Sequence, residues 1–266
     1  MASEVRRLRG VRSTWVVVAG ALVLNAAVAA FTATRLPAGE LAVPDAVRSV
    51  AAVVPALPLP LTALAAAVLG ALAYGNEIRW PGLPASRVTA GRRLTALLAK
   101  SLVVGAAALL LAVAALGANV LAVWLALPAG VDASPLFDPS GLPAAPFAAG
   151  GAGRPLAAFL ALSVAGGWAG LLITSLVRSA VVGVLLTGAL PALLEPTAGL
   201  LLHRTGRNWP VWVRELLPFQ YGLDWVRSAA DRTAGALDGV VLAALLAPAA
   251  MLVLAAVLVQ SRRRSL

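Results

Sequence analysis

Residues 74–100 read Tyr74-Gly-Asn-Glu-Ile-Arg-Trp-Pro-Gly-Leu-Pro-Ala-Ser-Arg-Val-Thr-Ala-Gly-Arg-Arg-Leu-Thr-Ala-Leu-Leu-Ala-Lys100, and long apolar segments lie on both sides of them. They hold five of the chain's 21 Lys and Arg residues but only one acidic residue, Glu77. Loops rich in Lys and Arg stay on the cytoplasmic side of a membrane because they resist translocation. We therefore place residues 75–96 in the cytoplasm, and the side of every other segment follows by counting spans outward from this loop.

Composition places the chain among membrane proteins. Of its 266 residues 61% are hydrophobic and 12% are charged, and the mean hydropathy is +0.91, whereas soluble domains are about one quarter charged. Charges flanking a membrane explain the net charge of +10 better than a nucleic-acid partner does, because the basic residues are not interleaved with aromatic ones. The chain has no cysteine, which excludes disulfides, zinc thiolates and cysteine nucleophiles.

The apolar segments predict an all-α polytopic membrane protein. We expect a single transmembrane domain over residues 1–266, with six transmembrane helices and both termini in the cytoplasm. The first span also has features of a signal peptide, because Ala27-Val28-Ala29 fits a cleavage site. The predicted spans are about 14–33, 50–74, 97–127, 154–176, 180–202 and 238–260, with a cytoplasmic segment at 1–13, an outer loop at 34–49, a cytoplasmic coupling loop at 75–96 and an outer segment at 203–237.

Prolines interrupt the second span. Pro55, Pro58 and Pro60 crowd its outer half, and the uninterrupted part from Leu61 to Tyr74 makes only about 21 Å of helix at 1.5 Å per residue. That is too short for a hydrocarbon core of about 30 Å. We therefore expect the prolines at membrane depth, in a kinked segment that other helices cover.

Two local patterns predict how the later spans meet. Gly166 and Gly170 form a G-x-x-x-G pair, which allows close helix approach. The shortest loop is Val177-Arg178-Ser179, which the span count places in the cytoplasm. The outer segment is at odds with this topology, because it carries more Arg than the positive-inside rule favours. Those arginines are Arg204, Arg207, Arg214, Arg227 and Arg232.

The chain lacks the sequence motifs of the common catalytic sites. It has no G-x-x-x-x-G-K-[ST] loop, no H-E-x-x-H and no G-x-S-x-G, so it has no phosphate-binding loop for ATP of that kind. His203 is the single histidine, and a membrane-interface position suits it better than a catalytic role. We expect no enzymatic activity, no metal site and no cofactor site on this chain.

Polar residues at membrane depth are the candidates for a pathway or gate. They are Glu195, Asn25 and Asn119, and an ionisable group in a span is costly and marks a functional position. For the two asparagines, helix–helix hydrogen bonding is the role that the sequence favours. For Glu195 the alternative is a helix end that meets water. In the gate role, Glu195 pairs with Arg204 or Arg207, or contacts a cationic part of a substrate.

The loop and the span order together resemble a known family. Glu77 and Arg79 follow the second span, Pro84-Ala-Ser-Arg87 comes next, and basic residues lead to Lys100 at the start of the third span. Leu216-Leu-Pro-Phe219 precedes the last span. This pattern resembles the membrane (permease) subunit of a type-2 ABC transporter, an exporter family. The resemblance covers nearly the whole chain through span order, and its local motifs are moderately specific.

The resemblance implies a partner-driven exporter. In that family a coupling helix in the first cytoplasmic loop docks on a separate ATP-binding subunit, which binds ATP and Mg. Two membrane subunits, identical or different, form the pathway in the bacterial cytoplasmic membrane, and a re-entrant outer hairpin lies between the fifth and sixth spans. The implied coupling residues here are Glu77, Arg79, Ser86, Arg87, Arg92 and Arg93.

One departure from the family shortens the expected coupling helix. The family usually has Gly-Thr soon after the Glu-x-Arg motif, whereas this chain has Trp80-Pro-Gly-Leu83 and then Pro84. The prolines restrict helix formation, so we expect the coupling helix only over residues 85–93.

Other functions remain as alternatives. A partner-independent secondary transporter favours intramembrane charges or inverted repeats, and the sequence contains no convincing repeat. A membrane enzyme is a second alternative, and the lack of a plausible set of catalytic residues in this chain argues against it. An assembly or anchoring protein is the third. Without the resemblance, the basic loop suits either a soluble acidic partner or anionic lipid.

Overall fold

The computed structural model describes residues 12–36, 43–52, 54, 57, 59–79, 90–131 and 153–189, and for residues 43–44, 76–79, 90–96 and 153–154 it describes the backbone alone. Every regular element in these ranges is a helix. The predicted sixth span at 238–260, the outer segment at 203–237, Ser86, Arg87 and Glu195 lie outside the described residues.

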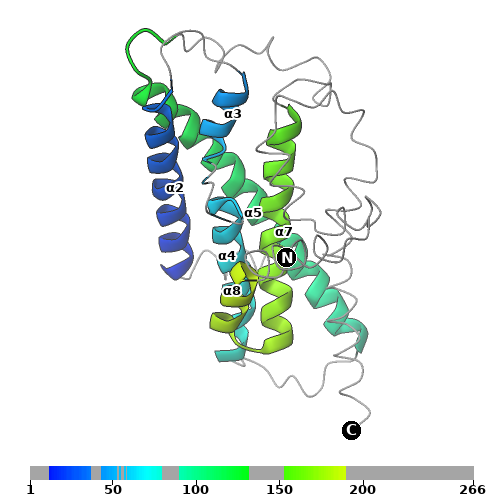
Figure 1. Ribbon diagram of the computed structural model, residues 1–266. Coiled ribbons are helices and arrows are strands. Elements are labelled where there is room, and N and C mark those ends of the chain that lie inside the picture. The colour runs from blue at the N-terminus through cyan, green and yellow to red at the C-terminus, as the bar shows by residue number, and fades with distance from the viewer. Residues whose placement is uncertain are drawn as a thin grey trace, which may run out of the picture.

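Helices of the described residues form one bundle (Figure 1). Three of them, over Arg12–Ala33, Leu97–Ala126 and Pro155–Val177, are long and apolar enough to cross a membrane, so the chain belongs among the helical membrane-embedded proteins. In chain order the helices are α2 (Arg12–Ala33), α3 (Val43–Val50), α4 (Leu61–Arg79), α5 (Ala90–Ala126), α7 (Gly153–Val177) and α8 (Ala180–Ala189).

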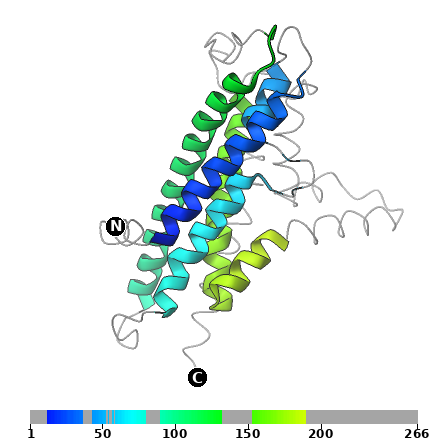
Figure 2. The ribbon, with the colours of Figure 1, turned by 90° about the vertical axis from the view of Figure 1, so that its left-hand side faces the viewer.

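Successive long helices run in opposite directions. Figures 1 and 2 show α4 ending, α5 beginning and α7 turning into α8 at the lower end of the bundle, and α2 starting on that side. We call this end, marked by Arg79, Ala90 and Ser179, the loop end. The end of α2, all of α3 and the end of α5 lie toward the opposite end. The described edges of three of the four segments that the sequence assigns to the cytoplasm thus lie on one side, and the fourth, the C-terminus, lies outside the described residues.

The tightest helix pair is α4 with α7. Gly166 and Gly170 of α7 lie directly against the backbone carbonyls of Ala63 and Ala67 in α4, and a Cβ added to Gly166 would lie 2.5 Å from the Ala63 oxygen. In the other direction, Gly70 of α4 lies against the carbonyl of Gly167. Small residues on both helices allow the two backbones to touch. The close approach predicted for the G-x-x-x-G pair is confirmed.

The expected outer loop at 34–49 contains a helix at its end. In α3, Ala46, Val47 and Val50 are buried, and the helix packs against α2 and α5. Asp45 in its first turn accepts a hydrogen bond from Arg48 at 3.5 Å on the exposed side. Packing of one apolar face therefore holds eight residues in a helix that would be marginal in isolation.

Of the predicted second span at 50–74, α4 covers the part from Leu61 onward and α3 contributes only Val50. Helix α3 ends at Val50 and α4 starts at Leu61, so residues 51–60, which we call the break, separate them. Ala52 has a positive φ of 47°, and the Pro60 carbonyl accepts hydrogen bonds from the N–H groups of Ala63 and Leu64 at 2.9 and 3.1 Å. Proline cannot donate within a helix, so this segment is interrupted where the sequence suggested a kink.

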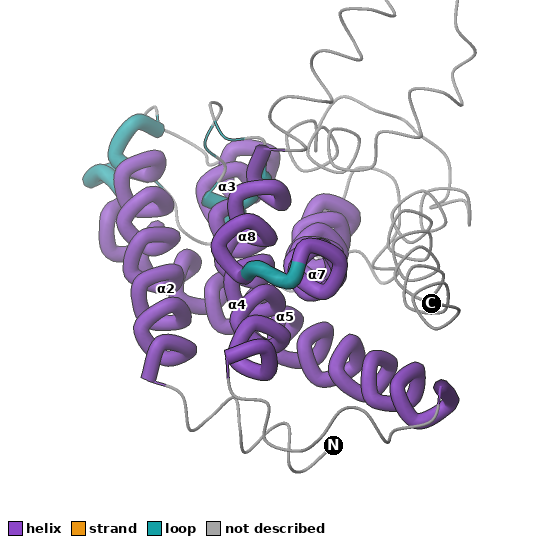
Figure 3. Tube along the Cα trace, turned by 90° about the horizontal axis from the view of Figure 1, so that it is seen from below, coloured by secondary structure: helices purple, strands orange, loops and turns teal. Residues whose placement is uncertain are grey.

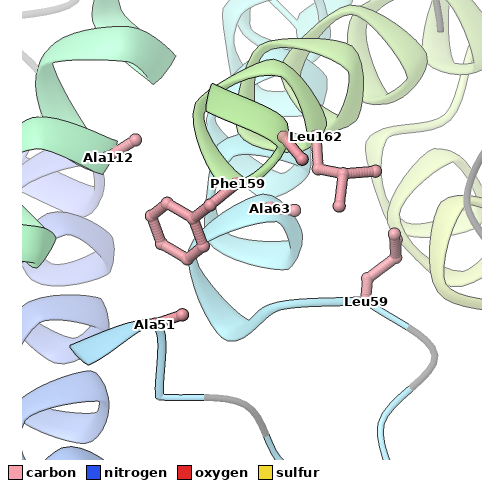
Figure 4. Packing of buried hydrophobic residues seen from close by; sticks show 7 residues of the cluster. Ala51, Leu59, Ala63, Ala112, Phe159 and Leu162 are labelled. Carbon is pink, nitrogen blue, oxygen red and sulfur yellow. The ribbon is translucent and has the colours of Figure 1, made fainter. Parts of the chain in front are cut away.

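Other helices cover the described part of the break. Ala51 and Leu59 are each 1% exposed. Figure 4 shows them beside Phe159 and Leu162 of α7 and Ala63 of α4. The break begins and ends partway along the bundle (Figures 1 and 2), at the depth of apolar side chains. Non-helical backbone at such a depth requires protein cover, and the packing supplies it.

Helix α5 is longer than a membrane crossing requires. Its 37 residues make about 55 Å of helix, against a core of about 30 Å. The apolar part begins at Leu97, and the seven residues before it include Arg92 and Arg93. Figure 1 shows α5 inclined to α2 and α7. Helix α5 therefore reaches past the apolar bundle at the loop end.

Candidate functional site

The candidate site is the loop end of the bundle, where the predicted coupling residues begin and end. Glu77 and Arg79 lie in the last turn of α4, and Arg92 and Arg93 lie in the first turn of α5. The sequence predicted a coupling helix over residues 85–93 that is separate from the third span at 97–127. In the structure, residues 90–93 belong to the same helix as that span, α5. The structure thus places both edges of the loop at the same end of the bundle.

A buried lysine lies beneath this loop. Lys100, the chain's single lysine, is 6% exposed in α5. Its Nζ lies 5.5 Å from the centre of the Tyr74 ring in α4. A cation over an aromatic face within about 6 Å is attracted by the ring quadrupole. This contact joins the helix that enters the loop to the helix that leaves it.

A tryptophan ties α7 to the same part of α5. The Trp168 indole Nε1–H donates a hydrogen bond to the Ser101 carbonyl at 2.8 Å. The ring lies over Gly105, where an added Cβ would be 2.9 Å from Nε1. Glycine leaves room for the indole, and the hydrogen bond satisfies its only donor. Three helices are therefore fixed to one another just inside the loop end.

The turn between α7 and α8 closes the loop end. Helix α7 ends at Val177 and α8 begins at Ala180, as the sequence predicted for this shortest loop. Ser179 precedes α8 and accepts two hydrogen bonds from its first turn. The Gly183 N–H donates to the Ser179 carbonyl at 2.9 Å, and the Val182 N–H donates to the Ser179 hydroxyl at 3.5 Å. Both bonds belong to the N-cap pattern. The turn is therefore held in one conformation by its own helix start.

Arg178 in this turn adopts an unusual backbone conformation. Its φ is +58°, a left-handed value that costs a residue other than glycine about 1–2 kcal/mol. Its N–H donates to the Thr174 carbonyl at 2.8 Å, which ends α7. Glycine is the usual residue at this position of a helix end. Arginine in its place, with an exposed side chain, was not predicted as a functional residue.

Two asparagines inside the bundle join helices, in agreement with the role that the sequence favoured. Asn25 of α2 accepts a hydrogen bond at its Oδ1 from the Thr62 hydroxyl of α4 at 3.2 Å. Asn119 of α5 donates from Nδ2 to the Val50 carbonyl at the end of α3, at 2.8 Å. Both asparagines are fully buried. They hold the region of the break, and their role in a pathway or gate stays a prediction.

We expect the Asn25–Thr62 hydrogen bond to stabilise the bundle measurably. In a double-mutant cycle of Asn25→Ala and Thr62→Val, the coupling should be about 0.6 kcal/mol, and at most about 1.7 kcal/mol. Reversible unfolding in detergent micelles measures it. Thr187 is the matched control, because its hydroxyl bonds the Gly183 carbonyl of its own helix. The effects of Asn25→Ala and Thr187→Val on the free energy of unfolding should be additive. If the effects of Asn25→Ala and Thr62→Val are additive as well, the Asn25–Thr62 hydrogen bond contributes nothing and the prediction is wrong.

Within the described ranges given above, no three His, Asp or Glu residues come together to hold a metal ion. Comparisons with protein-family models, with curated proteins and with solved structures found no match.

Proposed function

We propose that this chain is the membrane subunit of a type-2 ABC exporter in a bacterial cytoplasmic membrane. A separate subunit binds ATP and Mg and drives it, and a second copy or a related subunit completes the pathway. The observation that carries this proposal is the loop end. The described arginines of the predicted coupling loop, Arg79, Arg92 and Arg93, lie at the end of α4 and the start of α5, and α4 lies against the α7–α8 turn at Gly75, so one end of the bundle offers a surface for a soluble partner.

The single lysine lies inside the bundle and outside any phosphate-binding loop. Lys100 is buried within α5, ten residues after that helix begins, and contacts an aromatic ring. A phosphate-binding lysine instead follows a glycine-rich loop and is open to the nucleotide. A bundle with a basic loop and no nucleotide motif therefore needs an external source of energy for export against a gradient.

Exposed apolar side chains on α2 and α5 give the bundle two faces suited to lipid or to a second membrane subunit. Large hydrophobic residues on these helices are about half exposed or more. In the described structure they include Trp15, Val16, Val23, Phe31, Leu102, Leu110, Leu121 and Leu125. Apolar faces of this size belong in a membrane or an interface, as the proposed dimeric exporter requires.

The break favours one alternative, a partner-independent secondary transporter. Helices interrupted at membrane depth form the ion and substrate sites of many such proteins, and the described residues at the two ends of the break, between α3 and α4, are buried in the bundle. The two proposals differ in energy source. An ion gradient alone would drive the alternative, whereas the proposed exporter depends on an ATP-binding subunit.

We expect the loop end to face the cytoplasm. Because the chain has no cysteine, single cysteines can be introduced without background labelling. Ser86→Cys should react with a membrane-impermeant maleimide only in inside-out vesicles, since the basic loop resists translocation. Ser134→Cys, in the outer loop that the span count predicts over residues 128–153, should react only in intact spheroplasts. Labelling of Ser86→Cys from outside would overturn the topology and the proposed docking side with it.

Purification of the tagged chain from its native membranes in mild detergent tests the function. The proposal predicts that an ATP-binding subunit stays attached through repeated washing. It also predicts that this attachment depends on residues 75–93. A chain that remains fully folded and oligomeric but carries no ATP-binding subunit would favour the secondary transporter.

A further inference from the structure

We propose that the bundle holds a binding site for an uncharged, largely apolar substrate, whose hydroxyl or amide N–H donates a hydrogen bond to Oδ1 of Asn119. The site lies inside one membrane subunit, where α2, the end of α3 and α5 meet at the start of the break. This inference names the substrate class of the proposed exporter and, as a statement about transport, rests on the proposed function. Binding itself requires only the membrane chain and is tested on that chain.

The first observation is a buried acceptor without a donor. Asn119 is fully buried, and its Nδ2 donates to the Val50 carbonyl at 2.8 Å. Its Oδ1 is also buried and accepts no hydrogen bond from any residue that the structure describes. An unsatisfied buried acceptor costs more than an ordinary hydrogen bond contributes. In Asn25, by contrast, Nδ2 donates to the Ala21 carbonyl and Oδ1 accepts from the Thr62 hydroxyl. A donor on a ligand would therefore be stabilised at Asn119 and has no free acceptor at Asn25.

The second observation is strained backbone beside this acceptor. Ala52, with its φ of +47°, adopts a left-handed conformation that disfavours a Cβ. It packs in one cluster with Val50, whose carbonyl Asn119 holds, and with Val123 of α5. Backbone strain of this kind is concentrated at functional sites. A ligand that enters through the break need not disrupt α3 or α4, because both helices end at its borders.

The third observation is that apolar side chains surround the acceptor. Leu116, three residues before Asn119, and Val123, four residues after it, lie on the same face of α5. Val123 is buried in a cluster with Ala29 and Ala33 of α2, and Leu116 packs against that cluster. Figure 3 looks along the bundle from the loop end and shows α3 and α4 between α2 and α7. One polar group among apolar side chains is typical of small-molecule sites, where few polar contacts fix the orientation of the ligand.

The surroundings favour an uncharged donor over a cation or a water molecule. An ammonium group buried without a carboxylate loses its hydration, and the end of a helix as short as α3 offsets little of that cost. A hard metal cation takes about six or more oxygen ligands, whereas the described groups at this point supply Asn119 Oδ1 and the Val50 carbonyl. A buried water typically makes about three hydrogen bonds. A single hydroxyl or N–H on an apolar body instead matches a single acceptor among apolar side chains.

Two ligands that differ only in the donor test this site. Para-hexylphenol carries a hydroxyl, and para-hexylanisole has the same apolar body with a methyl ether in its place. The tagged full-length chain, in lipid nanodiscs, is titrated with each ligand, and binding to empty nanodiscs is subtracted. We expect saturable binding of the phenol and about tenfold weaker binding of the ether, because the ether leaves the buried acceptor unpaired. Equal affinities in the wild-type chain, or no saturable binding of either ligand, would overturn the inference.

The same substitution at the two asparagines assigns the acceptor. Asn119→Leu should bind the phenol and the ether equally, because leucine offers no acceptor. Asn25→Leu is the matched control and should keep the preference for the phenol, since both polar atoms of the Asn25 amide already have partners. Each substitution removes a helix–helix hydrogen bond, so the ratio of the two affinities within one variant separates binding from stability. A preference that survives in Asn119→Leu, or that disappears in Asn25→Leu, would contradict the assignment.

A photoreactive phenol locates the site in the wild-type chain, so the test does not depend on the folding of a variant. With a diazirine on its hexyl chain, we expect adducts on residues 116–123 of α5 or residues 28–33 of α2. Adducts confined to other parts of the chain would place the ligand elsewhere and overturn the site at Asn119.

Failure of this site and failure of the proposed function give different results. A chain that carries the ATP-binding subunit but does not distinguish the phenol from the ether lacks the site, and the proposed exporter stands. A chain that binds the phenol at Asn119 but carries no such subunit has the site and is not an ATP-driven exporter. In the intact complex the phenol should raise the rate of ATP hydrolysis and the ether should not. If neither ligand changes that rate, the site does not bind a transported substrate.

Discussion

Replacing Gly170 with leucine is expected to prevent assembly of the bundle. Gly170 lies against the carbonyl of Ala67, and the added Cβ would meet backbone atoms on all three of its nearest contacts. Backbone cannot move aside as a flexible side chain can, so α4 and α7 must separate. Overpacking destabilises well-packed cores by about 1–3 kcal/mol and occasionally more. Because Gly170→Leu separates the tightest helix pair, we expect its cost at the upper end of this range. Fluorescence-detected size exclusion should show aggregated or absent protein.

Two control substitutions make this prediction specific. At Gly117 in α5 and Gly20 in α2, an added Cβ meets nothing within 4 Å, so Gly117→Leu and Gly20→Leu should leave the elution profile unchanged. Gly167→Ala gives an intermediate case, because its Cβ would lie 3.2 Å from the Ala108 Cβ. A well-folded Gly170→Leu protein would contradict the helix packing described here.

Reversing charge at the coupling loop is expected to remove the ATP-binding subunit while the membrane bundle stays intact. Either Glu77→Lys or the double change Arg92→Glu with Arg93→Glu alters the charge at the two edges of the loop. Like charges brought together at an interface cost several kcal/mol, so retention of the partner should fall by about tenfold or more. Copurification measures the loss, and melting temperature shows that the bundle is intact.

Arg35→Glu is the matched control for charge. Arg35 is exposed just past the end of α2, on the side away from the loop end, and its guanidinium lies 4.9 Å from the centre of the Phe31 ring. The same reversal there should leave partner binding unchanged. Equal losses in Arg35→Glu and in the loop variants would show that overall charge, and not the coupling loop, governs the association.

Local sequence features predicted those parts of the fold that depend on neighbouring residues. The G-x-x-x-G pair Gly166 and Gly170 indicated a close helix contact because small side chains are needed wherever two backbones touch. Val177-Arg178-Ser179 stood out as a short polar interval between two apolar runs, and α7 and α8 meet there. Run length and apolar composition likewise indicated the helices α2, α5 and α7.

Features that depend on distant residues could not be read from the sequence. Helix α3 looks like a loop by composition, and only burial of Val47 and Val50 against other helices makes it stable. The contact of Lys100 with Tyr74 and the bond from Trp168 to Ser101 join residues far apart in the chain. No pattern of spacing predicts such a pair. The positive φ at Arg178 could not be predicted either, because glycine is the residue that usually indicates a left-handed backbone at a helix end.

At the break, the proline pattern predicted the irregular backbone but not the contacts that hold it. Pro55, Pro58 and Pro60 indicated irregular backbone at membrane depth, and residues 51–60 separate two helices there. The sequence did not show that Asn119 meets the Val50 carbonyl at the end of α3. That hydrogen bond satisfies a backbone group which the end of a helix leaves without an intrahelical partner. The polar residue predicted as a gate candidate thus has a structural role at the break.

The claim that this chain is an ATP-driven exporter subunit is tested most directly by ATP hydrolysis in the complex that copurifies with the tagged chain. The assay needs no identified substrate. The purified wild-type complex in lipid nanodiscs should hydrolyse ATP on a separate subunit, and the rate should change when that subunit is dissociated from the membrane chain. The double variant Arg92→Glu with Arg93→Glu, purified in the same way, should carry little subunit and little hydrolysis. Full hydrolysis in that variant, or a folded wild-type chain that purifies with no ATP-hydrolysing subunit, would contradict the proposal that this chain is an ATP-driven exporter subunit.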